Sequence, residues 1–246
     1  MMDITQRLKS LDCFKDVPEW ILKNLSYQFE VVYIRQREVL FKEDTPIKDL
    51  YIVLYGSFKI QRKIPSSTPV ILNFLGRGEF LGVAMAGLTY PKYPASAIAN
   101  EDSAVLRFDR DFFLKELMKM DGILSAVNQQ IGERFLEFQN DRCMEKARVP
   151  QKVADFLIRI WSRQKDSGNS QIIIPITRKD IAHRVGTHSE TVIRVLSVWT
   201  KKGWIKTIDR HIEILDLGKL QEVRNEGHFK YPSGSASDNS QNVGST

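Results

Sequence analysis

Residues 177–204, TRKDIAHRVGTHSETVIRVLSVWTKKGW, decide the fold of the C-terminal part of this chain. Thr177 lies three residues before Asp180, which is the spacing of a helix start. Apolar residues recur at helical spacing along the short segment that follows: Ile181, Ala182 and Val185. Gly186 then suits a turn, because glycine adopts left-handed backbone angles without a steric penalty. The segment therefore predicts a short helix that ends in a tight turn.

A second helix is expected directly after this turn. Thr187 and Glu190 have the spacing of a capping box, with Thr187 at the N-cap and Glu190 at the third helical position. Lys202-Gly203 ends the helix, whose inner face is formed by Val192, Val195, Leu196 and Trp199. Two helices joined by a glycine-containing turn form a helix-turn-helix. The strands expected at Trp204–Thr207 and His211–Ile214 add a β-hairpin wing.

The outer face of this second helix carries side chains that suit base edges in a DNA major groove. Arginine matches guanine O6 and N7 with two donors, and glutamate accepts from cytosine N4. The candidate base-reading residues are Ser189, Glu190, Ile193 and Arg194. The alternative is that Glu190 and Arg194, four residues apart, only pair with each other. The candidate phosphate contacts are Arg178, Lys179, Thr187, Lys201, Lys202, Lys206 and Arg210.

The charge distribution also favours a polyanionic partner. The 246-residue chain has a formal net charge of +6. Residues 142–230 contain 18 Lys and Arg against 10 Asp and Glu, so this region carries the whole basic excess. Such asymmetry is expected when one half of a protein meets nucleic acid, although an inert basic surface has the same composition. Together with the helix-turn-helix, it indicates double-stranded DNA.

The N-terminal half has a different pattern, in which short β-branched and aromatic runs alternate with glycine and proline turns. Strands are expected at Gln28–Ile34, Leu50–Leu54, Phe58–Ile60, Val70–Phe74, Ala95–Ala99 and Ala104–Phe108. Helices are expected around Ile4–Leu11 and Pro18–Leu25. Many short strands predict a sandwich or a barrel-like roll. The expected fold class is therefore α+β, with an N-terminal β-roll and a C-terminal winged helix-turn-helix.

A long helix is expected over residues 122–147, between the two halves. Its apolar positions recur every three or four residues: Ile123, Leu124, Val127, Ile131, Phe135 and Phe138. Such a stripe packs either on its own domain or on a second copy of the helix. We expect four regions: a β-roll with flanking helices (1–118), the long helix (119–147), a DNA-binding domain (148–226) and a disordered tail (227–246).

Composition excludes several classes of protein. No uncharged apolar run reaches the length of about 18 residues that a membrane span needs, and no signal peptide is recognisable, so we expect a cytoplasmic protein without membrane contact. Cys13 and Cys143 cannot supply the four thiolates of an iron–sulfur cluster. His183 and His188 are five residues apart and do not share a metal-binding face. We expect no metal site and no catalytic residues.

Three segments resemble the CRP/FNR superfamily of bacterial transcription regulators, and the resemblance covers roughly residues 10–220. The segment DLYIVLYGSF at 49–58 is similar to the family's strand–glycine–strand signature, and GEFLG at 78–82 to the start of its phosphate-binding cassette. Residues 186–194 are similar to its recognition-helix motif, whose Glu and Arg fall on Glu190 and Arg194. The resemblance implies that residues 1–118 form a sensor with a cyclic-nucleotide-binding-like β-roll, that residues 119–147 form a dimerisation helix, and that residues 148–226 form a winged helix-turn-helix.

The cassette departs from that of the cyclic-nucleotide binders in this family. Val83 stands where they have Glu, and Ala95 stands where an Arg would meet the cyclic phosphate. A cyclic phosphate would lose its charge-assisted hydrogen bonds, so we expect no ordinary cAMP binding. Haem is not expected either, because all four histidines lie in or after the DNA-binding part. The cofactor is therefore unknown, and the candidate effector pocket comprises Gly78, Glu79, Gly82, Val83, Ala95 and Ser96.

The leading hypothesis is a homodimeric, sequence-specific transcription regulator that binds a pseudo-palindromic DNA site. RNA polymerase is an additional candidate partner. One alternative is a DNA-binding regulator of the same fold that needs no effector, for which the altered cassette argues. The other is a small-molecule-binding or enzymatic protein with an incidental helix-turn-helix, and it ranks last because no nucleophile–base set or nucleotide-binding loop is recognisable.

Overall fold

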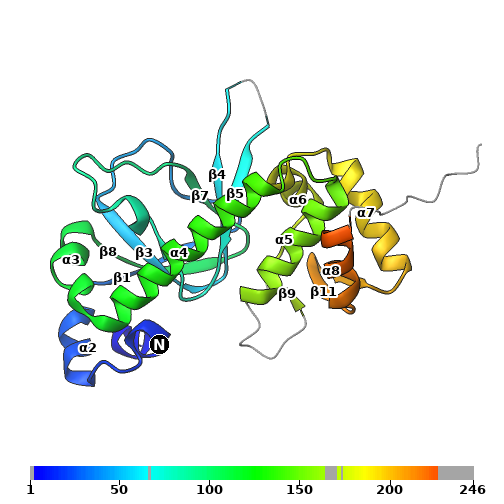
Figure 1. Ribbon diagram of the computed structural model, residues 1–246. Helices are drawn as coiled ribbons and strands as arrows, with labels where there is room; N and C mark the ends of the chain where they lie inside the picture. The colour runs from blue at the N-terminus through cyan, green and yellow to red at the C-terminus, as the bar shows by residue number, and fades with distance from the viewer. Residues whose placement is uncertain (1–2, 66–67, 164–170, 173, 227–246) are drawn as a thin grey trace, which may run out of the picture.

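The computed structural model describes residues 3–65, 68–163, 171–172 and 174–226 (Figure 1). A β-rich N-terminal part and a mainly helical C-terminal part lie at opposite ends of the molecule, and one long helix runs between them. This arrangement confirms the α+β prediction. The tail predicted at 227–246 lies outside the described residues.

The N-terminal part is a β-roll made of two antiparallel four-stranded sheets. One sheet has the order β1 (Glu30–Ile34), β8 (Ser103–Asp109), β3 (Asp49–Tyr55), β6 (Phe80–Leu81). The other has the order β2 (Val39–Phe41), β7 (Ser96–Ala99), β4 (Phe58–Arg62), β5 (Val70–Leu75). The sequence predicted six of these strands. It missed β2 and β6, which have three and two residues, because runs this short do not establish a period.

Gly56 lies at the turn that passes the chain from β3 to β4 and thus from one sheet to the other. Its φ is +77°, which glycine adopts readily, and a Cβ atom there would come within 2.2 Å of Ser103 Oγ. Ser103 Oγ in turn accepts a hydrogen bond from Ser57 N at 3.2 Å. The turn therefore needs glycine for both its backbone angle and its close contact with β8.

Short helices close one end of the roll, and their apolar faces join its core. They are α1 (Ile4–Lys9), α2 (Glu19–Ser26) and α3 (Arg110–Lys115), with 3-10 turns at Asp12–Phe14 and Leu117–Lys119. Another 3-10 turn, Val83–Met85, follows β6 and lines the cavity described below. The long helix α4 (Asp121–Cys143) begins on this core, where Ile123 and Val127 are buried. It ends four residues before the predicted position 147. The domain boundaries at 118 and 147 stay predictions.

The C-terminal part is built around a second hydrophobic core, in which Trp199 is fully buried. Its helices are α5 (Val149–Arg163), α6 (Arg178–Val185), α7 (Ser189–Lys201) and α8 (Leu217–Glu226). Its small sheet has the order β10 (Ile205–Ile208), β11 (His211–Ile214), β9 (Gln171–Ile172). Ile71 and Phe74 of β5 belong to the same core, so the roll and the C-terminal part pack directly together.

None of the helices that the structure describes combines the length and apolarity needed to cross a bilayer.

Candidate nucleic-acid interface and its link to the sensor

The helix-turn-helix begins with a complete capping box on α6. Thr177 Oγ1 accepts a hydrogen bond from Asp180 N at 3.1 Å, and the Asp180 carboxylate accepts one from Thr177 N at 3.2 Å. Gly186 ends the helix with φ of +71°, the left-handed conformation for which glycine is suited. Thr187 N then donates to Ala182 O at 3.0 Å, so the chain turns back on the last turn of α6.

The predicted capping box between Thr187 and Glu190 is wrong. His188 occupies the N-cap of α7, has an extended backbone and makes no side-chain cap hydrogen bond. The amides of Thr191 and Val192 bond to His188 O, so α7 starts one residue later than predicted. The cause is that the Thr187 amide is already bonded to α6, which leaves His188 as the residue that changes direction.

The predicted division of α7 into two faces is confirmed. The inner face is buried in the second core through Val192, Val195, Leu196 and Trp199. On the outer face, Glu190 and Arg194 are exposed, Ile193 is 48% exposed, and Ser189 is half-buried. In the described part of the chain, neither Glu190 nor Arg194 makes a salt bridge or a side-chain hydrogen bond. The alternative in which these two side chains pair with each other is therefore not observed.

The candidate phosphate contacts surround this outer face. Arg178 and Lys179 open α6, Thr187 is half-buried in the turn, and Lys201 and Lys202 end α7. Lys206 lies on β10, and Arg210 lies at the tip of the wing. The wing turns through Asp209 and Arg210, whose φ angles are +44° and +69° and match a tight hairpin turn. Helix α7 lies on the side of its domain away from the β-roll (Figure 1).

The start of α6 is tied to the sensor by an ion pair. Lys59 Nζ on β4 lies 2.8 Å from Asp180 Oδ1, and the two side chains are 22% and 9% exposed. Burial alone would raise the pKa of Asp180, but hydrogen bonds from Lys59 and Thr177 hold that pKa below its usual value. The Asp180 carboxylate therefore both caps the helix-turn-helix and connects it to the β-roll.

This ion pair predicts a specific pH dependence of stability. Because the Asp180 pKa is lower in the folded state, its contribution is complete above the unfolded-state pKa of about 4 and is lost as pH falls through the native value. The contribution of Asp180 is the difference in free energy of unfolding between wild type and Asp180→Asn, measured by denaturation at several pH values. The wild-type advantage should be constant near neutral pH and shrink in acid, whereas exposed Asp209→Asn should have little effect. A wild-type advantage that does not change with pH would contradict the assignment.

A second set of ion pairs lies where α4 crosses α5. Arg134 of α4 pairs with Glu79 and with Glu137, the latter at 3.0 Å. Arg163 of α5 lies 3.8 Å from Glu79 and 3.7 Å from Glu137. Burial by itself raises the Glu137 pKa, but Arg163 and Arg134 bring that pKa below its usual value. These contacts link the β-roll, α4 and the C-terminal domain.

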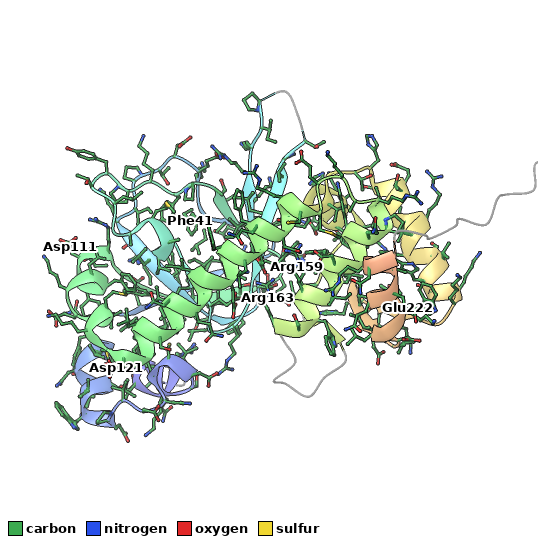
Figure 2. All side chains as sticks on the ribbon, viewed as in Figure 1. Phe41, Asp111, Asp121, Arg159, Arg163 and Glu222 are labelled. Carbon is green, nitrogen blue, oxygen red and sulfur yellow. The ribbon has the colours of Figure 1, made fainter. Side chains whose placement is uncertain are left out.

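The same set continues toward the helix-turn-helix. Arg159 contacts Asp141 at 2.8 Å and the buried Asp155 at 2.6 Å, and Arg184 of α6 contacts Asp141 at 2.8 Å. Arg159 and Arg163 lie in the middle of the molecule, between its two ends (Figure 2). We call the eight residues the junction network: Glu79, Arg134, Glu137, Asp141, Asp155, Arg159, Arg163 and Arg184. Four arginines face four carboxylates, so the network is electrically balanced.

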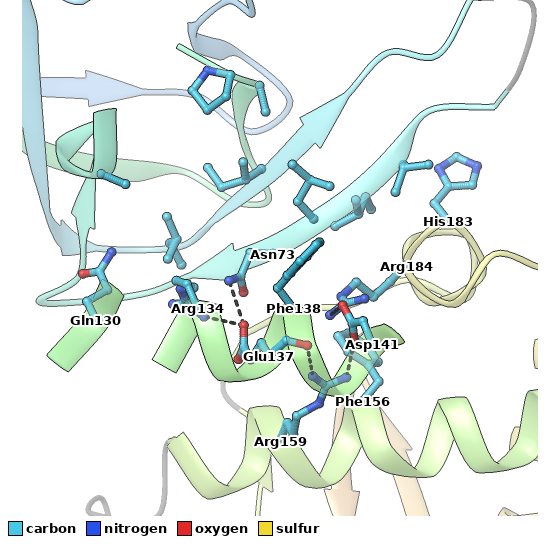
Figure 3. Close-up of a pocket in the computed structure, with 18 of the residues that line it drawn as sticks. Asn73, Gln130, Arg134, Glu137, Phe138, Asp141, Phe156, Arg159, His183 and Arg184 are labelled. Carbon is cyan, nitrogen blue, oxygen red and sulfur yellow. Dashed lines mark hydrogen bonds and ion pairs between the residues drawn. The ribbon is translucent and has the colours of Figure 1, made fainter. Parts of the chain in front are cut away.

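Three of the six predicted effector-pocket residues line a cavity of about 840 Å³: Gly82, Val83 and Ala95. The other three lie outside its walls. Gly78 forms a turn with φ of +81°, Glu79 belongs to the junction network, and Ser96 Oγ accepts a hydrogen bond from Glu43 N at 2.9 Å. The cavity lies between the β-roll, α4 and α6 (Figure 3).

The six residues of the predicted apolar stripe on α4 differ in burial and do not all face the same surface. Ile123 and Val127 are buried in the sensor core and cannot face a partner, which corrects two of the six predicted positions. Leu124 and Phe135 are exposed, and Ile131 and Phe138 are exposed residues that also line the cavity. Leu136, which is 64% exposed, was not singled out from the sequence.

The junction network was also missed, although part of its signal is present in the sequence. Arg134, Glu137 and Asp141 follow one another at steps of three and four residues, which places them on one face of a helix. Their partners Glu79, Arg159, Arg163 and Arg184 lie 18 to 55 residues away along the chain. No spacing rule brings such distant residues together. Among the described residues, no group of three or more His, Cys, Asp or Glu is placed to hold a metal ion.

A β-roll joined by a long helix to a winged helix-turn-helix defines a two-domain regulator with a sensor and a DNA-binding part. Residues 31–120 match the family model of the cyclic nucleotide-binding domain, and residues 151–223 match that of the Crp-like helix-turn-helix domain. The chain belongs to the CRP/FNR superfamily of transcription regulators, whose members bind DNA through the helix-turn-helix.

Relatives and solved structures agree with this assignment. The transcriptional regulatory protein btr of Bordetella pertussis is 27% identical over 79% of this chain and 81% of its own length. The CRP-like cAMP-activated global transcriptional regulator of Mycobacterium tuberculosis is 24% identical over 84% of this chain and 93% of its own length. FixK2 from Bradyrhizobium japonicum has a similar fold, with a TM-score of 0.68, 20% identity and coverage of 79% of this chain and 96% of that structure.

Proposed function

We propose that this chain regulates transcription, rather than catalysing a reaction, as a homodimer that reads a pseudo-palindromic DNA site through α7. The observation that carries the proposal is the exposed outer face of α7, where Glu190 and Arg194 have no partner in the described part of the chain. Arginine can bond guanine through two donors, and glutamate can accept from cytosine. The surrounding lysines and arginines would bind phosphates and fix the register of the helix in the groove.

The dimer is supported by an exposed seam along α4. Three of its residues are exposed and do not line the cavity, Leu124, Asn128 and Phe135, and they lie at steps of four and seven along the helix. Ile131, Phe138 and Arg142 complete the four-and-three repeat of a two-stranded coiled coil, and these exposed residues lie where the seam borders the cavity. Asn128 takes a core position at which a single polar residue specifies register at some expense of stability. A parallel pair about a two-fold axis would place two copies of α7 one DNA turn, about 34 Å, apart.

Two positions in the sensor, 83 and 95, bear on which effector this chain could bind. Val83 and Ala95, which line the cavity, leave no acidic group for a ribose and no cation for a cyclic phosphate at those positions. This supports a regulator that does not respond to cAMP in the ordinary way. If ligand-stripped protein binds its DNA site as tightly as untreated protein, the effector-independent form of the proposal is correct. RNA polymerase as a partner stays a prediction.

Replacing Arg194 with alanine should weaken discrimination between DNA sequences. Loss of a two-donor contact to guanine costs about 1–3 kcal/mol per half-site and relaxes specificity at that base pair. Lys206→Ala is the matched control: affinity should fall evenly for all sequences, and the salt slope should decrease by about 1 per lost phosphate contact. Fluorescence anisotropy with the selected site and with random duplex measures both. If Arg194→Ala weakens the two duplexes equally, the base-reading role is wrong.

A further inference from the structure

The cavity of about 840 Å³ reaches from the sensor to the helix-turn-helix. Its volume lies within the range of about 300–1,000 Å³ that is typical of small-molecule sites. Phe138 of α4 points toward the strands of the β-roll, and His183 of α6 lies at the opposite end of the cavity from Gln130 (Figure 3). The wall on the DNA-binding side continues through Arg184 and Val185 to Gly186, the turn residue that precedes α7.

The wall contributed by the β-roll is entirely uncharged. Its residues are Phe41, Ile60, Val70, Ile71, Leu72, Asn73, Leu75, Phe80, Gly82, Val83, Ala84, Met85, Tyr93, Pro94 and Ala95. Asn73 already donates to Glu137 at 3.0 Å, and the Tyr93 hydroxyl donates to Asp49 O. Gln130 of α4 bonds both Phe80 N and Phe80 O. The side chains of Asn73, Tyr93 and Gln130 are therefore already hydrogen-bonded within the protein.

Most of the charged residues on the opposite wall are already paired. Those next to the β-roll belong to the junction network, in which each arginine contacts one or two carboxylates. An anionic ligand would have to break these part-buried ion pairs, and separating such a pair leaves an uncompensated charge. The remaining charges, Arg142, Glu145 and Lys152, lie where α4 gives way to α5, beyond the network.

One group at the helix-turn-helix end is free to bind a ligand. In the described residues, His183 makes no side-chain hydrogen bond or ion pair. Its pKa is lowered by burial and by Lys179, so the imidazole is neutral at pH 7. A neutral imidazole donates with one nitrogen and accepts with the other. It therefore suits a hydroxyl or a carbonyl group.

We propose that this cavity binds an uncharged, mainly apolar small molecule whose single polar end meets His183, and that the molecule thereby contacts both the sensor and the helix-turn-helix. The proposal deepens the regulatory function proposed above and rests on it. Since the ligand would touch α6 next to Gly186, its binding would favour one placement of α7 relative to the sensor. By linkage, DNA and ligand would then alter each other's affinity by the same factor.

Nile red, an uncharged apolar fluorophore, tests the chemistry of the cavity in the full-length protein. We expect saturable binding with a blue-shifted emission, displacement by 1-decanol and no displacement by cAMP. Absence of saturable binding would overturn the proposal. So would displacement by cAMP at concentrations as low as those of 1-decanol, because the cavity would then accept an anion.

Two tryptophan substitutions test the location. Ala84 is exposed and lines the cavity, so Ala84→Trp should fill space and weaken Nile red binding by about 10-fold or more. Thr89 is exposed in the same segment but does not line the cavity, so Thr89→Trp should change the affinity less than about 2-fold. Equal effects of the two substitutions would place the bound dye elsewhere and overturn the proposal.

DNA binding is measured on the same samples, so failure of this inference can be told from failure of the regulatory function. If the protein binds a discrete DNA site but not Nile red, only the ligand proposal falls. If it binds Nile red in the cavity but no discrete site, the regulatory function falls. If both bind, 1-decanol should shift affinity for the DNA site by about 5-fold or more in either direction.

Discussion

Phe135→Arg should convert the protein from a dimer to a monomer. Phe135 is 59% exposed and lies in the middle of the α4 seam, so two copies of the substitution would place like charges directly opposite each other at a core position. Light scattering with size-exclusion chromatography should give the mass of one chain. Because a monomer engages one half-site at a time, affinity for the full site should fall roughly 100-fold or more.

Leu136→Arg is the matched control for this prediction. Leu136 is the next residue of α4 and is 64% exposed, but the helical rotation of about 100° per residue turns it away from the seam. It should remain a dimer with nearly unchanged DNA affinity. If both variants stay dimeric, or if only Leu136→Arg dissociates, α4 does not pair through the proposed seam.

Arg159→Met should lower the free energy of unfolding by about 3–5 kcal/mol, the range measured when one partner of a buried ion pair is removed. Arg159 bonds Asp155, whose side chain is 5% exposed, at 2.6 Å and Asp141 at 2.8 Å. After the substitution, the side-chain amide of Asn140 still donates to Asp155 at 3.2 Å, but this amide is uncharged, so the buried carboxylate loses its Arg159 charge partner. Urea denaturation, monitored by near-ultraviolet circular dichroism, measures this decrease in the free energy of unfolding.

A double substitution separates the role of the pair from simple loss of packing. Asp155→Leu combined with Arg159→Met removes both charges and should recover most of the stability lost in the single variant. The exposed Arg107–Glu30 pair is the comparison, because its side chains are 42% and 61% exposed. Arg107→Met should cost less than about 1 kcal/mol. A double variant less stable than Arg159→Met would show that the pair is not held by mutual neutralisation.

The two threonine-containing helix starts show what sequence spacing can and cannot settle. Thr177 with Asp180 and Thr187 with Glu190 have the same spacing, yet only the first forms a capping box. The second fails because the left-handed turn at Gly186 directs the Thr187 amide back to Ala182 O. Spacing therefore locates the helices correctly, while the local hydrogen bond that ends α6 decides where α7 begins.

The other predictions also succeeded where a local pattern sets the structure and failed where packing between distant segments sets it. The two faces of α7, the wing and six strands follow from local periodicity, and the structure contains them. The stripe on α4 was ambiguous because apolar residues at similar spacing serve two surfaces: Ile123 and Val127 face the sensor core, and Phe135 faces outward. The wall of the cavity at His183 depends on how the C-terminal domain packs on β5, which no local pattern encodes.

The central claim is that two copies of α7 read one pseudo-palindromic site. Nuclease footprinting of the purified protein on fragments of its own genome tests this claim most directly. The account predicts discrete protected sites whose two half-sites are centred about one helical turn, roughly 10 base pairs, apart, with protection lost in Arg194→Ala. Uniform protection that depends only on salt, or protection that survives in Arg194→Ala, would contradict it.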